Sequence, residues 1–579
     1  MYETDIEKLV NSFKNIEKLY AENKIEEVKS LIKNYLEFLP TDSETLTTLG
    51  VILFEQKLYE ESIPLFENAL KIDSKNPVYL TNLGASLKEI GKLDEAIVLF
   101  NNALKIDPNL FSALYNLANT YQKLGSFVLS EKWYCYAINI NPLFAPSYNN
   151  LGTLYKDRGK LDLAITCFLR AIECDPTNAI IFSNYLFCLN YLFIDKELCF
   201  KEHKKYSSYS KYIPSFFPIT SLYKKQLNVG YVSPDFRKHS IAHFMYPILH
   251  GHSYKVKVFC YSDTKKEDAV TDELKKVSDY WRNTSLMSNE VLYTLIKSDK
   301  IDILVDLAGH SGDNRMVLFS MKPAKIQISY LGYPNTTGLK EINYKITEEV
   351  IDDSDKYYTE KLVRMTNMLC YNPLFKTPDI SELPCLKNKF LTFGSFNNRV
   401  KINDKVINTW SKLLKNTPDS KLILKSSLKT DKHSRLQLLL KFIEQGVDSS
   451  RITILPYLSI YEHLESYNLI DISLDTFPYN GTTTTIESLW MGVPVIALKG
   501  DRHCSRMGES ILYKVGMTEW VMSSINEYKI PVSIEEVGYL RTTLRNRILN
   551  SCLVNEKLFI KELEQIYFKM YNGEENCEL

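Results

Sequence analysis

The first third of the chain carries a hydrophobic pattern that recurs every 34 residues. Three series of residues keep this step: the pairs Leu49-Gly50, Leu83-Gly84, Leu117-Ala118 and Leu151-Gly152; the alanines Ala69, Ala103, Ala137 and Ala171; and the pairs Asp107-Pro108, Asn141-Pro142 and Asp175-Pro176. Three series with one period predict stacked units of two helices each. The small residues mark close helix contacts, and each proline ends the second helix of a unit. Gly91, Gly125 and Gly159 fall at the predicted turn between the two helices.

This pattern resembles the tetratricopeptide repeat, with four clear units across about 45–178. Residues 11–42 are predicted to form a degenerate capping unit, and 179–212 to be helical without the signature, so the repeat domain is expected to span 1–212. Such arrays stack into a superhelix whose concave groove holds a peptide or protein. An alternative stays open, in which the array is a spacer or a dimerisation arm that does not touch substrate.

Beyond about residue 213 the period stops, and short apolar runs alternate with amphipathic helices. The proline-containing segment 213–226 predicts a linker. Two series of runs follow, at 227–233, 256–262, 301–309 and 326–333, and at 390–397, 421–427, 451–457, 472–478 and 494–500. These runs are apolar throughout, which is typical of parallel strands buried on both faces.

A polar bridge at about 371–388 separates the two series of predicted strands. The fold class is therefore α plus α/β: a helical superhelix followed by two doubly wound sheets in two lobes. The lobes are expected at 227–375 and 376–572, with a tail at 573–579. Ligands of such sheets bind at the carboxyl ends of the strands, so a cleft between the lobes is the predicted site.

Composition excludes several function classes. Lys plus Arg and Asp plus Glu both number 70, so the chain has no bulk charge for a nucleic acid. The N-terminus lacks a basic segment followed by an apolar core, and no run of roughly 18 apolar residues occurs, so neither a signal peptide nor a membrane span is expected. Eleven scattered cysteines without a CxxC pair favour free thiols in the cytoplasm and no zinc site.

The first motif, Asp235-Phe-Arg-Lys-His239-Ser-Ile-Ala-His243, directly follows the strand predicted at 227–233. A loop at this end of a strand faces the cleft. A histidine there titrates near neutrality, so His239 can accept a proton from a hydroxyl or balance a phosphate. The alternative is a histidine that only caps the following helix.

The second motif, Ser395-Phe-Asn-Asn398-Arg-Val-Lys401, follows the first strand of the second lobe. A lysine is a compact positive charge that suits a diphosphate leaving group, which gains negative charge as the glycosidic bond breaks. A solvated loop lysine is the alternative interpretation.

The third motif runs from Leu474 to Gly492 and places Thr482, Thr483, Thr484 and Thr485 at a helix start. Free N–H groups and the helix dipole make such a start a phosphate site, and Glu487, about one turn later, is placed to accept from a ribose hydroxyl. An ordinary helix cap is the alternative. No Walker sequence, GxGxxG or paired-carboxylate motif occurs, which favours a metal-independent site.

Together the segments GYVSPDFRKH, LVDLAGH, YLGYPNTTG, GSFNNRVKI and LDTFPYNGTTTTIESLWMGVPV resemble the protein O-linked N-acetylglucosamine transferases and their Spindly-type relatives. The resemblance covers nearly the whole chain in the right order. It implies a GT-B glycosyltransferase with an N-terminal tetratricopeptide array, which inverts the sugar on transfer to Ser or Thr of a protein. The acceptor would lie along the repeat groove, and the repeats could form a homo-oligomer.

The resemblance also implies roles for single residues. Catalytic roles fall on His239, at the position of a cleft histidine once proposed as the base, and on Lys401, which steadies the diphosphate. Donor contacts are implied for Asn398, Leu458, His463 on the nucleotide base, Thr482, Thr483 and Thr484 on the phosphates, and Glu487 on the ribose. The acceptor side is implied for Asp306, His310 and His243.

Two departures from the animal O-GlcNAc transferases bear on the donor. Those enzymes carry a histidine where Thr482 stands and a large insert between the lobes. The run GTTTTIES and Lys425 resemble Spindly-type enzymes, which use GDP-fucose in plants, whereas the pair of His239 and His243 resembles the O-GlcNAc enzymes. The expected donor is UDP-GlcNAc with GDP-fucose as the alternative, and an inactive repeat scaffold is the alternative from another class.

Overall fold

The computed structural model describes residues 42–210, 224–425 and 432–574 of the chain. The predicted capping unit at 11–42, most of the predicted linker at 213–226 and most of the predicted tail lie outside these ranges. The chain divides into two compact units, Met1–Leu154 and Tyr155–Leu579. No helix in the described ranges is long and apolar enough to cross a bilayer.

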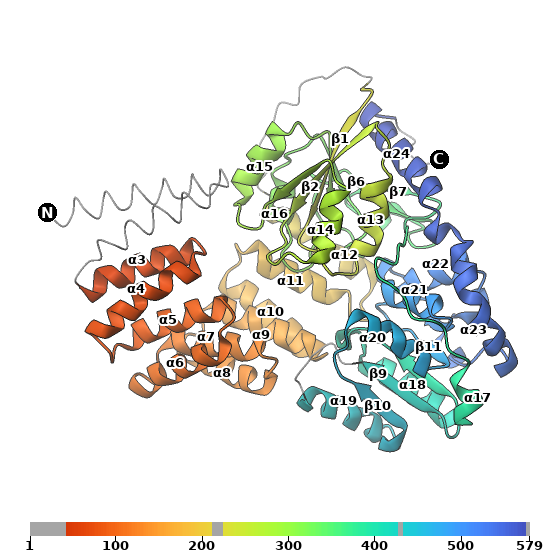
Figure 1. Cartoon of the computed structure of the whole chain (residues 1–579), viewed down its shortest axis with the longest axis horizontal. Helices are drawn as coiled ribbons and strands as arrows, with labels where there is room; N and C mark the ends of the chain where they lie inside the picture. The colour runs from red at the N-terminus through yellow and green to blue at the C-terminus, as the bar shows by residue number, and fades with distance from the viewer. Residues whose placement is uncertain (1–41, 211–223, 426–431, 575–579) are drawn as a thin grey trace. The chain divides into compact units, whose positions relative to one another are not determined.

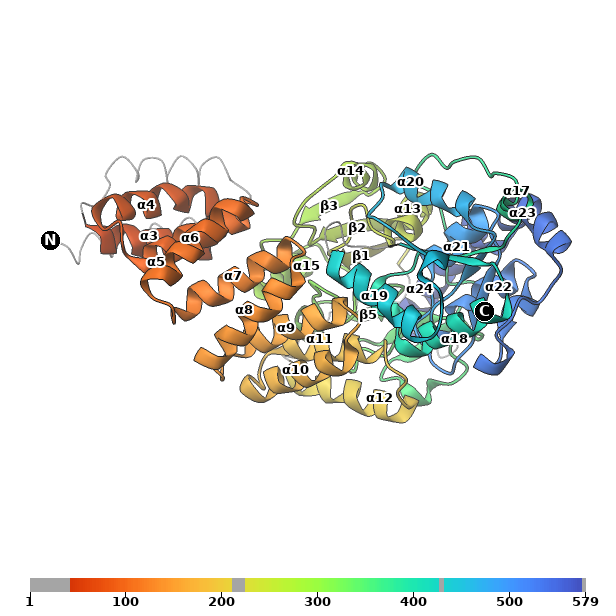
Figure 2. The same cartoon turned by 90° about the horizontal axis from the view of Figure 1, so that it is seen from below.

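The described part of the first unit consists of paired antiparallel helices, most of which pack against the next helix in the chain (Figure 2). They are α3 (Ser43–Glu55), α4 (Tyr59–Ile72), α5 (Pro77–Glu89), α6 (Leu93–Ile106), α7 (Phe111–Lys123), α8 (Phe127–Ile140) and the start of α9 (Ala145–Asp157). Ala69, Ala103 and Ala137 are fully buried, as expected of small residues at helix contacts. The turn glycines Gly91 and Gly125 have φ of 88° and 75°, a region that favours glycine.

The Leu-Gly positions of the repeat are explained by an aromatic ring in the following helix. A Cβ atom on Gly50 would lie 2.5 Å from the ring of Phe66, and one on Gly84 would lie 2.8 Å from the ring of Phe100. Both rings are buried, at 1 % and 0 % exposure. Each glycine therefore lets the two helices of one unit approach until the ring fills the space between them.

The last helices of the array belong to the second compact unit. These are α10 (Leu161–Cys174), α11 (Ala179–Leu189) and α12 (Lys196–Lys204). Tyr333 of the first lobe contacts α12 and the end of α11. Its hydroxyl lies 2.7 Å from Nε2 of His203 and accepts from Nδ2 of Asn190 at 3.2 Å. These buried polar contacts join the end of the array to the α/β domain.

The first lobe holds a seven-stranded parallel sheet in the order β3-β2-β1-β4-β5-β6-β7 (Figure 1). Its strands are β1 (Leu227–Ser233), β2 (Val256–Ser262), β3 (Tyr280–Asn283), β4 (Ile303–Asp306), β5 (Ile326–Ser329), β6 (Tyr344–Thr347) and β7 (Lys361–Arg364). The order reverses between β1 and β4, which creates a crevice at their carboxyl ends.

The second lobe repeats this plan with six parallel strands in the order β10-β9-β8-β11-β12-β13. They are β8 (Thr392–Ser395), β9 (Lys421–Lys425), β10 (Ile452–Leu455), β11 (Ile472–Leu474), β12 (Val495–Leu498) and β13 (Val521–Met522). Here the reversal lies between β8 and β11. All nine strands expected from the apolar runs are present, although most are shorter than predicted.

The C-terminal helix α24 (Glu556–Asn572) packs against the first lobe, although the sequence assigned it to the second (Figure 1). Its Glu564 carboxylate lies 3.1 Å from Nδ1 of His252, and its Tyr567 hydroxyl lies 3.1 Å from that of Tyr231. The end of the chain thus returns from the second lobe to the first, and α24 connects the two lobes.

We predict that Gly84→Val destabilises the first unit by about 2 kcal/mol, because the added methyl groups would overlap the ring of Phe100. Thermal unfolding followed by far-ultraviolet circular dichroism measures the change. The matched control is Lys105→Val at an exposed helix position, which is expected to cost only a few tenths of a kcal/mol. Equal melting temperatures for the two variants would contradict the packing role of Gly84.

Candidate functional site

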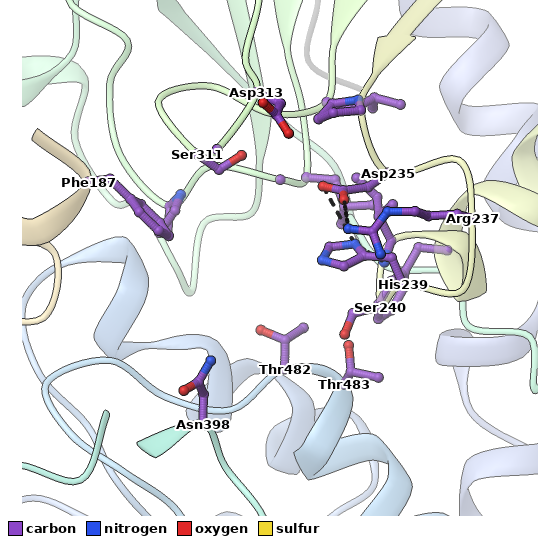
Figure 3. A pocket seen from close by; sticks show the side chains of 18 of the residues that line it. Phe187, Asp235, Arg237, His239, Ser240, Ser311, Asp313, Asn398, Thr482 and Thr483 are labelled. Carbon is purple, nitrogen blue, oxygen red and sulfur yellow. Dashed lines mark hydrogen bonds and ion pairs between the residues drawn. The ribbon is translucent and has the colours of Figure 1, made fainter. Parts of the chain in front are cut away.

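A cavity of about 910 Å³ lies between the two lobes, at the carboxyl ends of the strands that flank both crevices. His239 and Ser240, which follow β1, face Thr482 and Thr483 of the second lobe across it (Figure 3). A second hollow of about 430 Å³ adjoins the cavity and shares His239, Ser240, Thr483 and Thr484 with it. The three motifs singled out in the sequence therefore meet at one site.

Lys401 supplies a positive charge to the larger cavity. Its Nζ donates to the carbonyl of Asn480 at 2.7 Å and lies 4.2 Å from the ring centroid of Tyr479. Burial lowers the pKa of Lys401 to about 8, and the nearby Asp475 opposes this effect. The ammonium group is therefore held in place by a carbonyl and an aromatic face, while its residue remains part of the cavity lining.

Asp475, which directly follows β11, fixes the loop that leads into α21 (Thr483–Trp490). One carboxylate oxygen accepts from the backbone N–H of Gly481 at 2.7 Å and of Thr476 at 2.8 Å. The other oxygen has no hydrogen-bond partner among the described residues. Burial raises the pKa of Asp475 to about 7. The sequence analysis overlooked this residue, although an acid directly after a strand at a crevice is a usable signal.

The start of α21 presents a helix dipole to the cavity. Thr482 is its N-cap residue and makes no side-chain cap hydrogen bond. The next hydroxyls are engaged: that of Thr484 donates to Oδ1 of Asn397 at 3.0 Å, and that of Thr485 donates to the carbonyl of Gly481 at 3.0 Å. The first N–H groups of a helix have no intrahelical partner, so this end is suited to an anion.

Asn398 lies beside this helix end, on the same side of the cavity as Thr482 (Figure 3). Its side chain accepts from the backbone N–H of Val400 at 3.3 Å and caps the short turn that carries Lys401. Asn398 thus lines the cavity and also orients the turn beside it.

The smaller hollow contains a chain of charged groups. Nε2 of His463 lies 3.1 Å from a carboxylate oxygen of Glu487, and Nδ1 lies 2.7 Å from Nζ of Lys425. Burial lowers the pKa of Lys425 to about 8. Burial favours the neutral form of Glu487, but His463, His243 and Lys425 together hold the pKa of its carboxyl below the ordinary value.

These partners fix the tautomer of His463. Its Nε2–H donates to Glu487, and its Nδ1 accepts from the ammonium of Lys425. The edge of the ring meets Phe396 at a centroid distance of 5.8 Å, and the half-buried Leu458 lines the same hollow. The hollow therefore combines apolar and charged side chains, and it can take a nucleobase and its ribose.

The two histidines of the first motif occupy different places. His239 lines both hollows; its Nδ1 is 3.7 Å from the Asp235 carboxylate and 3.4 Å from the N–H of Ile241. Burial lowers the pKa of His239, although Asp235 opposes the effect. His243 lines only the smaller hollow of the two, where it stacks on Tyr371 at 5.3 Å.

Asp306 and His310 lie behind the larger cavity and do not line it. The Asp306 carboxylate accepts from the backbone N–H of Ala308 and Gly309, and burial raises its pKa to about 6. His310 bridges the hydroxyl of Ser183 and the carbonyl of Thr337, and burial lowers its pKa to about 3. Both residues therefore shape the loop beneath the cavity, and direct acceptor contacts for them stay a prediction.

Comparison with known proteins now decides the family. Residues 196–371 and 381–563 match the model of glycosyl transferase family 41.

The chain belongs to glycosyl transferase family 41.

Models of the tetratricopeptide repeat match the N-terminal array at 43–76, 86–125, 111–142 and 145–178. These matches confirm the predicted family resemblance and the predicted fold class.

Several curated relatives are similar to this chain over part of its length. A probable UDP-N-acetylglucosamine–peptide N-acetylglucosaminyltransferase SPINDLY of Oryza sativa is 36% identical over 417 residues, which cover 69% of this chain and 45% of that protein. The relative named SEC in Arabidopsis thaliana is 31% identical over 371 residues, which cover 60% and 37%. The family 41 chain thus spans less than half the length of these relatives.

One solved structure is matched over almost its whole length, unlike the curated relatives above. A mutant of the Thermobaculum terrenum O-GlcNAc transferase superposes with a TM-score of 0.79 at 29% identity, covering 86% of this chain and 98% of that chain. This chain therefore shares its two-lobed fold with a repeat array with that O-GlcNAc transferase.

Proposed function

We propose that this family 41 chain is a protein O-glycosyltransferase that transfers N-acetylglucosamine from UDP-GlcNAc to Ser or Thr with inversion. The observation that carries the proposal is the convergence of two positive features, Lys401 and the start of α21, on one cavity beside a nucleoside-sized hollow. The names of the relatives, which describe UDP-N-acetylglucosamine–peptide N-acetylglucosaminyltransferases, support the same donor and a peptide acceptor.

In this proposal the nucleoside enters the smaller hollow, with its base against His463 and Leu458 and its ribose toward Glu487. The diphosphate reaches the N–H groups of Thr482, Thr483 and Thr484 and the hydroxyls of Thr482 and Thr483, with Asn398 and Lys401 beside it. Negative charge develops on the diphosphate as the glycosidic bond breaks. Preorganised positive charge at that place lowers the barrier.

The sugar then projects into the larger cavity, where an acceptor hydroxyl attacks the anomeric carbon from the face opposite the diphosphate. We assign the base role to His239, because it lines both hollows and has the Asp235 carboxylate beside it. Asp306 and His310 support the loop on the acceptor side, and His243 supports the wall of the smaller hollow.

The repeat array is the proposed route of the acceptor, since stacked helix pairs form a groove that fits an extended polypeptide. We also propose that the array supports a homo-oligomer. A cytoplasmic location fits the cysteines of the described residues, all of which are free thiols.

Two alternatives make different predictions about nucleotides. GDP-fucose is the alternative donor, because Lys425 and the run of threonines resemble Spindly-type enzymes. An inactive scaffold is the alternative from another class, and it predicts that no nucleotide binds. Lys401 and the start of α21, which no side chain caps, line the same cavity. This arrangement favours an active enzyme over a scaffold.

We predict that Lys401→Met lowers transfer at least about a hundredfold, because the leaving diphosphate loses its ammonium partner. The assay follows sugar from UDP-GlcNAc or GDP-fucose onto Ser or Thr of lysate proteins by mass spectrometry, with EDTA present. The matched control is Lys412→Met at an exposed position of α18 (Asp404–Asn416), which is expected to keep wild-type activity.

Near-normal transfer by Lys401→Met would contradict the leaving-group role. Loss of wild-type transfer in EDTA would contradict the metal-independent part of the proposal. The mass increment separates the donors, because a hexosamine and a deoxyhexose differ in mass.

We predict that affinity for UDP or GDP falls as the pH rises above about 8. Burial lowers the pKa of Lys401 and of Lys425 to about 8, so both are protonated and attract the ligand below that pH. For each lysine that loses its proton, the affinity for the nucleotide can fall by up to about tenfold per pH unit. Lys401→Arg should remove its share of the decline, since a guanidinium keeps its proton throughout.

Titration calorimetry across this pH range measures the effect, with Lys412→Arg as the matched control. A pH-independent affinity for the wild type would show that neither lysine contributes its charge to the binding of the nucleotide.

A further inference from the structure

His503 is an imidazole of the larger cavity to which the proposed mechanism gives no role. It lies between β12 and α22 (Met507–Lys514), and it lines the cavity together with Lys401, Tyr479 and Met507. Only 4 % of the residue is exposed. The sequence analysis passed over it, because nothing in the sequence links it to the three motifs.

Asp352, which comes from the first lobe, holds the ring of His503. Its carboxylate oxygen Oδ2 lies 2.7 Å from Nδ1 of His503 and also accepts from the hydroxyl of Thr347, while Oδ1 accepts from the hydroxyl of Tyr358. Burial disfavours the charged form of Asp352, but His503 and these hydroxyls hold its pKa below the ordinary value. An ionised carboxylate only accepts, so Nδ1 of His503 must carry a proton.

The opposite edge of the ring is the part left for the cavity. Nε2 of His503 has no partner among the residues that the structure describes. In the neutral imidazole with a proton on Nδ1, Nε2 presents a lone pair. The arrangement of a buried carboxylate, an oriented imidazole and a free nitrogen is therefore suited to accept a hydrogen bond from a hydroxyl.

The neighbourhood of His503 places it on the leaving-group side of the cavity. The carbonyl of the next residue, Cys504, accepts from the N–H of Asn480 at 2.8 Å. The carbonyl of Asn480 in turn accepts from Nζ of Lys401 at 2.7 Å. An acceptor hydroxyl must approach from the face opposite the diphosphate. A ligand hydroxyl that meets His503 on the diphosphate side therefore belongs to the transferred sugar and not to the acceptor.

We propose that Nε2 of His503 accepts a hydrogen bond from a hydroxyl of the transferred sugar, with Asp352 as the positioning residue that orients the ring. This assignment rests on the proposed function, since it requires a nucleotide sugar in the cavity. It makes His503 a determinant of which sugar the site holds, separate from the groups that hold the nucleoside diphosphate.

The test compares each nucleotide with and without its sugar. Titration calorimetry measures UDP, UDP-GlcNAc, GDP and GDP-fucose binding to the full chain and to His503→Leu. We expect the affinity for the nucleoside diphosphate to stay within about twofold of wild type, and that for the cognate nucleotide sugar to fall roughly tenfold. His503→Gln should recover part of the loss, because its amide oxygen can accept the same hydrogen bond.

The matched control is His433→Leu at an exposed position, which should leave all four affinities unchanged. Melting temperatures of both variants show whether the fold survives.

An equal loss of affinity for the nucleoside diphosphate and for the nucleotide sugar, or no loss of affinity for either, would overturn the proposal. His503 and Asp352 would then serve only as a structural contact between the lobes. A fall in turnover with donor affinity intact would overturn it in favour of a role toward the nucleophile. Failure of wild type to bind any of the four ligands would refute the proposed function itself.

Discussion

The second lobe is built around one requirement: an ammonium group has to stay charged beside the cavity although burial favours its neutral form. Lys401 meets this requirement because a carbonyl and an aromatic face hold its ammonium group. Asp475 fixes the adjoining loop through two backbone N–H groups, and that loop aims the start of α21 at the same cavity. The lysine, the loop and the helix end therefore form one mutually supporting arrangement.

The first lobe completes the site, and its position depends on contacts that join it to the rest of the chain. Helix α24 returns from the second lobe to pack on the first, through pairs such as His252 and Glu564. The last helices of the array are fastened to the first lobe through Tyr333. The imidazole of His503 and the carboxylate of Asp352 also meet from opposite lobes. The contacts of α24 and of His503 with the first lobe limit how far the facing walls of the cavity can separate.

Local periodicity explains why much of the fold could be predicted. A step of 34 residues revealed the array, and apolar runs located nine strands. The strands that the sequence analysis missed, such as the two-residue β13 and the partly exposed β3, are too short or too polar for that signal. The motifs that follow β8 and β11 converge because these parallel strands share a carboxyl edge, and the motif that follows β1 faces them because the cavity is lined from both sheets. Contacts between distant segments, such as His503 with Asp352, leave no local trace, and a strand end does not reveal the depth at which Asp306 is buried.

The most direct measurement of the central claim is a crystal structure of the chain soaked with UDP or GDP. We expect a diphosphate within hydrogen-bond distance of Nζ of Lys401 and of the N–H groups that begin α21, with the base against His463. A diphosphate bound elsewhere, or the absence of bound nucleotide at saturating concentration, would contradict it.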